Sequence, residues 1–376
     1  MPSIANLSRF EHVLGVAHLA ETAGFRTNLT RLEDLSLKAA ALLHDWAITS
    51  FGHLVEEALQ YVGATFHHEQ RLSDILFGEG REELLGVDLQ ILLGRSAGLR
   101  DWAKKAVGSD SNELLRGITN HIRGKGKFGP AIAGDIDLDN IDNVYRMAFH
   151  MGLEIDKKAP ERLSKSMVSV DYENREIIFL EQALDDLMNW QVTRKDVYTH
   201  LMLSENDFIG KMMILYATIE AYQNEIISED DWKLVDFDFI NKMTKSNIKS
   251  VREASQRWIV GELWDSIPLH WMSGIRPAYK NMLSFSELAS DAINRPCFAY
   301  GIKDKRNRPL SITFDNGNKV TLGCTSDRWL LGIGSPTRRS FTQNETNTLL
   351  ELACSTFGTC VVPEDTVATN DQASLF

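Results

Sequence analysis

Apolar residues recur every three or four positions through most of residues 4–230, with few β-branched runs and almost no proline. Clear examples are LEDLSLKAAALLHDW and DVYTHLMLSENDFIGKMMILYATIEAYQ. This spacing places the apolar side chains on one face of an α-helix, so it predicts a mainly helical region. Glycine-rich breaks interrupt the pattern, most clearly GKGKFGP at 124–130, and SMVSVDYENREIIFL is expected to form a short hairpin.

The pattern changes toward the C-terminus. Residues 231–290 hold clustered tryptophan and phenylalanine and are expected to add further helices. After Pro296 the apolar period falls to two, so CFAYGI, PLSITFDNGNKVTLGC and RWLLGIGS are predicted to be strands, with DNGN as a hairpin turn. Thr342 and Glu345 have capping-box spacing and are expected to open a final helix.

The predicted fold class is therefore mainly α, with a small C-terminal α+β module. We expect a helical domain over 1–230, a helical extension over 231–294, the α+β module over 295–362 and a flexible tail over 363–376. With 376 residues, the chain is long enough for two or three domains.

Charge and composition narrow the classes of partner. The chain carries 40 Lys and Arg against 52 Asp and Glu, a net charge of −12, so nucleic acid is an unlikely partner. No apolar stretch approaches the roughly 20 residues of a membrane helix, and the N-terminus lacks a signal-peptide pattern. We expect a cytoplasmic protein with no membrane partner. The four cysteines show no metal-binding or disulfide spacing and are expected to be reduced.

Histidine is concentrated in the first 150 residues, where four segments combine it with acidic residues in a fixed order. This order, H, then HD, then D, resembles the HD-domain metal-dependent phosphohydrolases. More narrowly, it resembles their deoxynucleoside triphosphate triphosphohydrolase branch, which includes the sterile-alpha-motif and HD-domain enzyme of vertebrates. The segments are RFEHVLGVAHLAE, ALLHDWAITSFGHLVEE, FHHEQRLSDIL and GDIDLDNIDNVYRMAFHMG.

By this resemblance His12, His44, Asp45 and Asp139 are expected to hold one divalent metal ion. Two imidazoles and two carboxylates suit Mn, Fe or Mg better than a metal that prefers thiolates. His44 and Asp45 would lie about 100° apart on one helix, whereas His12 and Asp139 must come from other helices. The ion would lower the pKa of a bound water and neutralise charge on a phosphoryl oxygen.

Candidate catalytic residues lie in the second and third segments. His53 and Glu56 have i, i+3 spacing, so the carboxylate can hold the imidazole and favour its protonated form as a proton donor or phosphate clamp. By the resemblance, His68 is the leading candidate for the general acid, with Glu69 as its acidic neighbour.

Four further residues are candidate substrate contacts. Arg9 lies three residues before His12, and the resemblance implies a contact with a phosphate or the base. Tyr198, in a Y-x-H sequence, would reach the sugar. Lys125 and Lys127, in the glycine-rich loop, could lie against substrate phosphates, although an exposed turn gives the same pattern.

The resemblance implies hydrolysis of a (deoxy)nucleoside triphosphate to nucleoside and triphosphate by a homo-oligomer. Positions where this family often carries triphosphate-handling or sugar-handling residues hold Asn140, Asn143, Met147 and Trp190 instead. Two alternatives therefore stay open: an HD-type phosphomonoesterase or phosphodiesterase for a smaller or cyclic nucleotide, and a nucleotide-binding sensor or assembly subunit without turnover.

Overall fold

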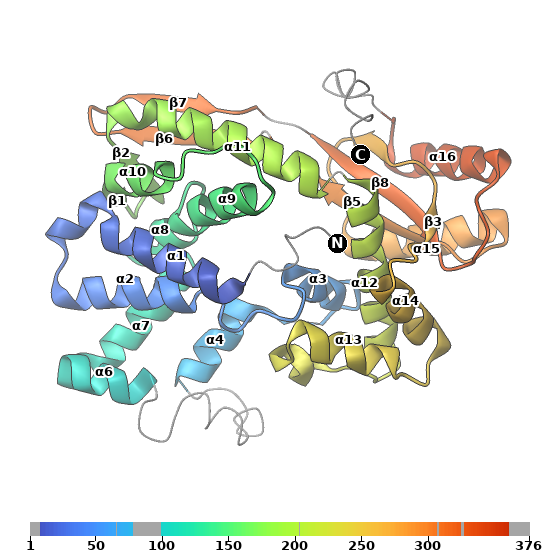
Figure 1. Cartoon of the computed structure of the whole chain (residues 1–376), viewed down its shortest axis with the longest axis horizontal. Coiled ribbons are helices and arrows are strands. Elements are labelled where there is room, and N and C mark those ends of the chain that lie inside the picture. The colour runs from blue at the N-terminus through green and yellow to red at the C-terminus, as the bar shows by residue number, and fades with distance from the viewer. Residues whose placement is uncertain are drawn as a thin grey trace. The chain divides into compact units, whose positions relative to one another are not determined.

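The computed structural model describes residues 8–64, 66–77, 99–202, 204–306, 308–324 and 327–360 (Figure 1). Over these residues the protein is mainly helical, as the apolar spacing predicts, and its short strands form two sheets. The predicted tail over 363–376 lies outside the described residues. None of the described helices is both long enough and apolar enough to span a lipid bilayer.

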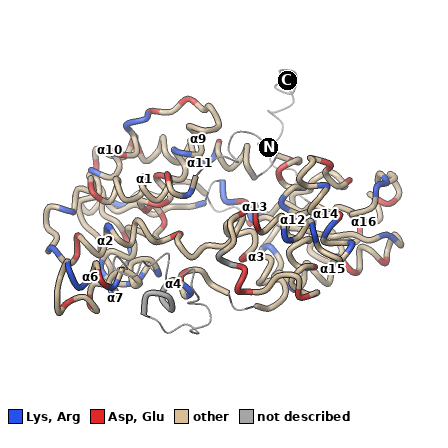
Figure 2. The backbone as a smooth tube through the Cα atoms, turned by 60° about the horizontal axis from the view of Figure 1, so that its bottom comes forward, with Lys and Arg blue, Asp and Glu red and all other residues tan. Residues whose placement is uncertain are grey.

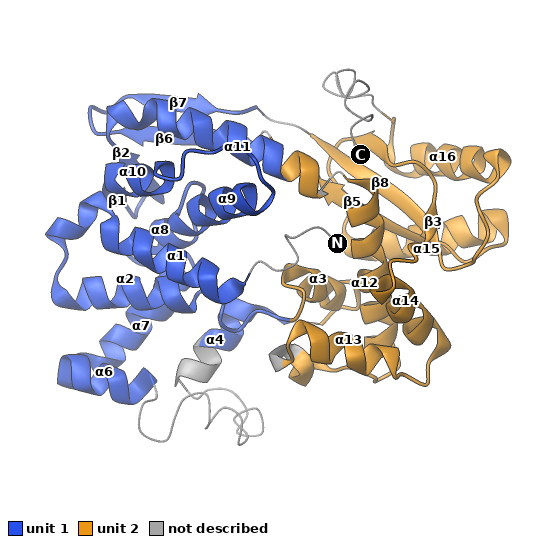
Figure 3. Cartoon of the chain, viewed as in Figure 1, with its two compact units in different colours: residues 1–49, 66–197, 307–324 blue, residues 50–65, 198–306, 325–376 orange. Residues whose placement is uncertain are grey.

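The chain forms two compact units, each made of separate stretches of sequence (Figure 3). Unit 1 comprises residues 1–49, 66–197 and 307–324, and unit 2 comprises residues 50–65, 198–306 and 325–376. This division differs from the consecutive segments expected from composition, because the chain passes several times between the units. Basic and acidic positions are interspersed along the backbone of each unit (Figure 2).

Unit 1 contains most of the helices of the N-terminal half and one of the sheets. Its elements, in chain order, are α1 (Arg9–Thr22), η2 (Gly24–Asn28), α2 (Arg31–Leu43), α4 (His68–Phe77), α6 (Leu99–Val107), η4 (Gly108–Asp110), α7 (Ser111–Ile122), α8 (Gly129–Ile132), α9 (Leu138–His150), α10 (Ala159–Ser166), β1 (Met167–Asp171), β2 (Glu176–Phe179), η5 (Glu181–Ala183), the larger part of α11 (Leu184–Met202), β6 (Leu310–Phe314) and β7 (Lys319–Leu322).

The helices that surround the histidine-rich segments pack through apolar faces. α2 begins with a capping box in which Thr30 and Glu33 satisfy each other's backbone N–H groups. It packs on α1 and on α7, and Leu37, Leu114 and Ile118 are fully or almost fully buried. α1 also packs on α9. This packing brings together α1, the end of α2 and α9, which are the segments that carry the predicted metal ligands.

The sheet of unit 1 confirms the predicted hairpins and corrects their grouping. β1 and β2 pair antiparallel, as do β6 and β7, and Gly317 has a positive φ of 84° in the turn between β6 and β7. β2 and β6 then pair in parallel, giving the order β1-β2-β6-β7. The strands after Pro296 therefore do not form a single module, because β6 and β7 join the earlier hairpin.

Unit 2 is built around one helix that is buried on several sides. Along α12 the side chains of Phe208, Met212, Leu215 and Ile219 are fully or almost fully buried. Its elements are α3 (His53–Tyr61), the end of α11, α12 (Glu205–Gln223), η6 (Glu229–Lys233), α13 (Asp236–Thr244), α14 (Lys249–Ile259), β3 (Asp265–Ser266), β4 (His270–Ser273), α15 (Tyr279–Ile293), β5 (Phe298–Lys303), β8 (Arg328–Ser335) and α16 (Gln343–Phe357).

The second sheet is centred on β8, which pairs antiparallel with β3, β4 and β5. The strands β3 and β4 correct the expectation of only helices over 231–290. They are short and interrupted by Pro268, so their local pattern carries little strand signal. Their pairing depends on β8, which follows about sixty residues later in the sequence.

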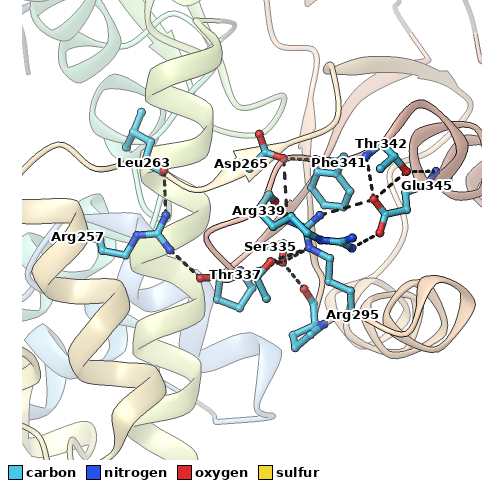
Figure 4. Close-up of polar contacts among 12 residues, drawn as sticks. Arg257, Leu263, Asp265, Arg295, Ser335, Thr337, Arg339, Phe341, Thr342 and Glu345 are labelled. Carbon is cyan, nitrogen blue, oxygen red and sulfur yellow. Dashed lines mark hydrogen bonds and ion pairs between the residues drawn. The ribbon is translucent and has the colours of Figure 1, made fainter.

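A polar network holds the start of α16 beside the end of β8 (Figure 4). The predicted capping box is present, because Thr342 and Glu345 bond to each other's backbone N–H groups. The buried Arg295 donates from Nε to Ser335 Oγ at 2.9 Å and to Thr337 Oγ1 at 2.7 Å, and its guanidinium stacks on Phe341. The N-terminal end of α16 is therefore tightly fixed.

Candidate metal centre

Three helical segments of unit 1 bring His12, His44 and Asp139 together. His12 lies on α1, His44 directly follows α2, and Asp139 is the second residue of α9. Nε2 of His12 is 2.9 Å from Oδ1 of Asp139, and Nε2 of His44 is 3.7 Å from the same oxygen. One ligand atom from each side chain lies within 4.8 Å of the other two. These three residues could hold a metal ion.

His44 presents a nitrogen suited to a metal. Its Nδ1 lies 2.9 Å from the backbone oxygen of Ala41. Because a carbonyl oxygen can only accept a hydrogen bond, Nδ1 carries the proton, and in the neutral ring Nε2 then has a free lone pair. That Nε2 atom is buried and has no hydrogen-bond partner among the described residues. A buried polar atom without a partner is costly, and a bound cation would satisfy it.

Asp45 is the fourth predicted ligand and lies next to His44. Its Oδ1 is 3.9 Å from His44 Nε2, and its side chain is partly exposed. The helix ends at Leu43, so the two residues occupy a turn and not the helix itself, although His44 keeps helical angles of φ −55° and ψ −38°. Ligand atoms about 2.1 Å from an octahedral ion lie about 3 Å apart. The separations observed here range from 2.9 to 3.9 Å, so His44 and Asp45 would have to move slightly inward to bind such an ion.

His12 is oriented by a carboxylate that the sequence interpretation did not identify. Its Nδ1 lies 2.7 Å from Oδ2 of Asp142, which is one turn after Asp139 on α9. Arg146 holds Asp142 through two hydrogen bonds of 2.8 Å. A carboxylate on the outer nitrogen of a ligating histidine fixes the ring and strengthens its metal-binding nitrogen. The sequence signal was the i, i+3 and i, i+4 spacing of Asp139, Asp142 and Arg146.

Gly15, on α1, leaves room for the Asp142–Arg146 ion pair of α9. A Cβ atom at Gly15 would lie 1.9 Å from Oδ1 of Asp142 and 2.2 Å from Nη2 of Arg146. Both distances are far inside van der Waals contact, so a larger residue would displace the carboxylate that orients His12. The local packing therefore favours glycine at this position of RFEHVLGVAHLAE.

The charges of the site favour a cation at its centre. Burial alone would lower the pKa of His12, but the hydrogen bonds to Asp139 and Asp142 outweigh it and raise the pKa to about 10. Burial likewise opposes the charge of Asp139, yet the two histidines hold its pKa below the usual range. The carboxylates thus stabilise positive charge between the imidazoles, which a divalent ion can supply.

The predicted catalytic residues lie on other elements. His53 and Glu56 form the expected pair at the start of α3 in unit 2, with Nδ1 of His53 3.1 Å from Oε2 of Glu56. The carboxylate is buried and the imidazole is largely exposed. His68 is the first residue of α4 in unit 1, and both His68 and Glu69 are half-buried. Their catalytic roles stay predictions.

The predicted substrate contacts lie on different elements of the two units. Arg9 is the half-buried first residue of α1, Lys125 is exposed, and Tyr198 is half-buried on α11 within unit 2. Lys127 forms an ion pair of 2.7 Å with Glu33 in the first turn of α2. His44 follows the opposite end of that helix, about 16 Å away at 1.5 Å per residue. The ion pair of Lys127 is therefore far from the metal ligands along α2.

Comparison with known proteins gives little further information. A scan of the sequence against models of protein families finds no match. The chain is 23% identical, over 241 residues, to an uncharacterized protein of Methanocaldococcus jannaschii. That alignment covers 62% of this chain and 45% of the relative, so the chain matches less than half of the relative's length. This similarity is too distant to show the family to which the chain belongs.

Proposed function

We propose that this chain is a metal-dependent phosphohydrolase of the HD-domain type that acts on a nucleotide. The observation that carries the proposal is the buried Nε2 atom of His44, which has no hydrogen-bond partner among the described residues and faces the carboxylate of Asp139 at 3.7 Å. Together with His12 it offers two imidazoles and a carboxylate from three helical segments. The H, HD, D order of the sequence supports the same conclusion.

The donor set suggests the class of metal. Two nitrogen atoms and the carboxylates of Asp139 and Asp45, with no sulfur, suit Mn, Fe or Mg. Such an ion, when bound, polarises a phosphoryl oxygen and makes water a better nucleophile near neutral pH. The donor atoms of this site and their spacing fit that role.

Neighbouring residues orient the two histidine rings of the proposed metal site. Ala41 and Asp142 keep the Nδ1 atoms of His44 and His12 engaged, which directs both Nε2 atoms toward Asp139. The carboxylates of Asp45 and Asp139 would repel a phosphate ester by themselves. Substrate binding is therefore expected to require the cation.

Phosphate binding and proton transfer are assigned to residues outside the ligand set. Arg9 lies one turn before His12 on α1 and is our candidate for a phosphate contact. Glu56 holds Nδ1 of His53, and this imidazole is our candidate for a proton donor or a phosphate contact. His68 remains the leading candidate for the acid that protonates the leaving oxygen.

Two residues argue against assigning a triphosphate substrate. Asn140 donates its side-chain amide to Asp137 at 3.0 Å, and Trp190 is fully buried. Both stand where the resembled branch often has residues that contact the triphosphate or sugar, and here both have structural roles. The substrate class is therefore proposed as a nucleotide phosphate ester, with the base and the number of phosphates left to experiment.

A product assay tests this proposal. Purified protein with Mn²⁺ or Mg²⁺ is incubated with ribo- and deoxynucleoside triphosphates, monophosphates and cyclic nucleotides, and the products are separated by anion exchange. We expect either nucleoside with intact triphosphate, or a monophosphate or orthophosphate, which would indicate the alternative esterase reaction. A His44→Ala preparation run in parallel reports contaminating phosphatase. Metal-loaded protein that turns over none of these substrates would contradict the proposal.

A further inference from the structure

Two cysteines meet at the C-terminal end of α16, in unit 2. The Sγ atoms of Cys354 and Cys360 are 2.9 Å apart, and both residues are partly exposed. Cys354 lies in the last turn of the helix, and Cys360 lies beyond its end. Their six-residue separation matches no common disulfide or metal motif, so the sequence predicts only reduced thiols here.

The turn that follows α16 creates this contact. Gly358 has a φ of 105°, which favours glycine, and its N–H donates to the carbonyl of Cys354 at 3.1 Å. The chain then runs beside β4, where Cys360 bridges Met272 and the carbonyl of Thr359 accepts from the N–H of Ser273. Two separate features therefore place the thiols together: the turn at the glycine and the pairing with the sheet.

We propose that Cys354 and Cys360 form a dithiol–disulfide pair that reacts with small-molecule disulfides such as glutathione disulfide. This inference is independent of the proposed metal chemistry. The other two cysteines differ in setting, since Cys297 is buried and Cys324 is exposed. Cys324 therefore serves as an internal control for simple accessibility.

The reaction follows thiol–disulfide exchange. One protein thiolate attacks a glutathione sulfur, which breaks the disulfide and releases one glutathione thiolate. The second protein thiolate then attacks the protein sulfur of the mixed disulfide and releases the second glutathione. The two protein thiols lose two electrons and two protons in total, and glutathione disulfide is reduced to two glutathione molecules. Burial and the neighbouring Cys354 raise the pKa of Cys360 to about 11, which disfavours Cys360 as the first attacking thiolate.

The bond would tie the end of α16 to the edge of the second sheet. The opposite end of the helix is already fixed by the Thr342 capping box and by the Arg295 network. A link between residues 354 and 360 would close a short loop through Gly358 and fasten the segment that pairs with β4. The helix would then be held at both ends.

The test uses the full chain and its single cysteine variants. Reduced protein is equilibrated without oxygen in buffers of varied glutathione and glutathione disulfide ratio, quenched with acid, alkylated and mapped by peptide mass. The variants are Cys354→Ser, Cys360→Ser and, as the control, Cys324→Ser. In wild type and in the control, the peptide that contains Cys354 and Cys360 should be lighter by the mass of two hydrogen atoms, because the two thiols have formed a disulfide.

The outcomes separate an internal disulfide from ordinary thiol reactivity. Because the second step is intramolecular, at least about nine-tenths of the wild-type molecules that react at this pair should carry the internal bond and not bound glutathione. In Cys354→Ser and Cys360→Ser the remaining cysteine should instead retain one glutathione. Wild type that accumulates glutathione on either cysteine, or that stays reduced at both while Cys324 reacts, would overturn the proposal.

Discussion

Replacing His44 by alanine should remove both the bound metal and the turnover. The substitution deletes one of the two nitrogen ligands and leaves mainly carboxylates to bind the ion. We expect Mn²⁺ affinity to fall by more than about 100-fold, which exceeds the usual effect of losing an outer partner of a ligand. Electron paramagnetic resonance of free Mn²⁺ measures the affinity, and the product assay measures the turnover.

The matched control for this variant is His18→Ala. His18 lies on α1, six residues after His12 and outside the ligand group. Circular dichroism and urea unfolding of both variants check that each protein keeps its fold, since His44 also bonds to Ala41. Undiminished metal binding and activity in folded His44→Ala protein, or equal losses in both variants, would refute the assignment of this ligand.

Replacing Asp142 by asparagine should weaken the site without removing a ligand. The asparagine amide can donate to Nδ1 of His12, which would favour a ring proton on Nε2, the nitrogen that must offer its lone pair to the ion. It also leaves Arg146 without its carboxylate. We expect Mn²⁺ affinity about 10- to 100-fold below wild type, with turnover recovering in part at high metal concentration.

The control for this effect is Asp156→Asn in the same unit. Asp156 also pairs with an arginine, Arg162, but on the surface, where solvent screens the ion pair. Its loss should leave metal affinity unchanged. Asp142→Glu, which keeps the charge, should recover part of the affinity that Asp142→Asn loses. An Asp142→Asn protein with wild-type affinity would show that Asp142 does not position His12.

The features predicted correctly from the sequence are those that local chemistry determines. Capping boxes at Thr30 and Thr342 need only a hydroxyl and a carboxylate three residues apart, and the one at Thr342 is predicted from the sequence. The DNGN turn needs a glycine that accepts a positive φ. In contrast, β3 and β4 depend on β8, and the grouping of β6 with β2 depends on tertiary packing that local periodicity does not contain.

The sequence predicts most residues of the candidate site but not its geometry, and the predicted ligand Asp45 lies outside the group of three that the fold brings together. The ordered H, HD, D segments indicated His12, His44 and Asp139, which the fold does bring together. The sequence pattern does not single out Asp142 and Arg146, because their role depends on how closely α9 packs against Gly15 of α1. Likewise, the glycine-rich loop predicts a phosphate contact for Lys127, but Lys127 forms an ion pair with Glu33. Charge alone did not distinguish a substrate contact from a surface ion pair.

The most direct test of the central claim is to locate the ion by anomalous diffraction from crystals grown with Mn²⁺. Our account predicts one strong peak in unit 1, about 2.0–2.3 Å from Nε2 of His12, Nε2 of His44 and a carboxylate oxygen of Asp139, with Asp45 completing the protein ligands. The absence of a peak among these residues at saturating Mn²⁺, or a peak only elsewhere, would contradict it.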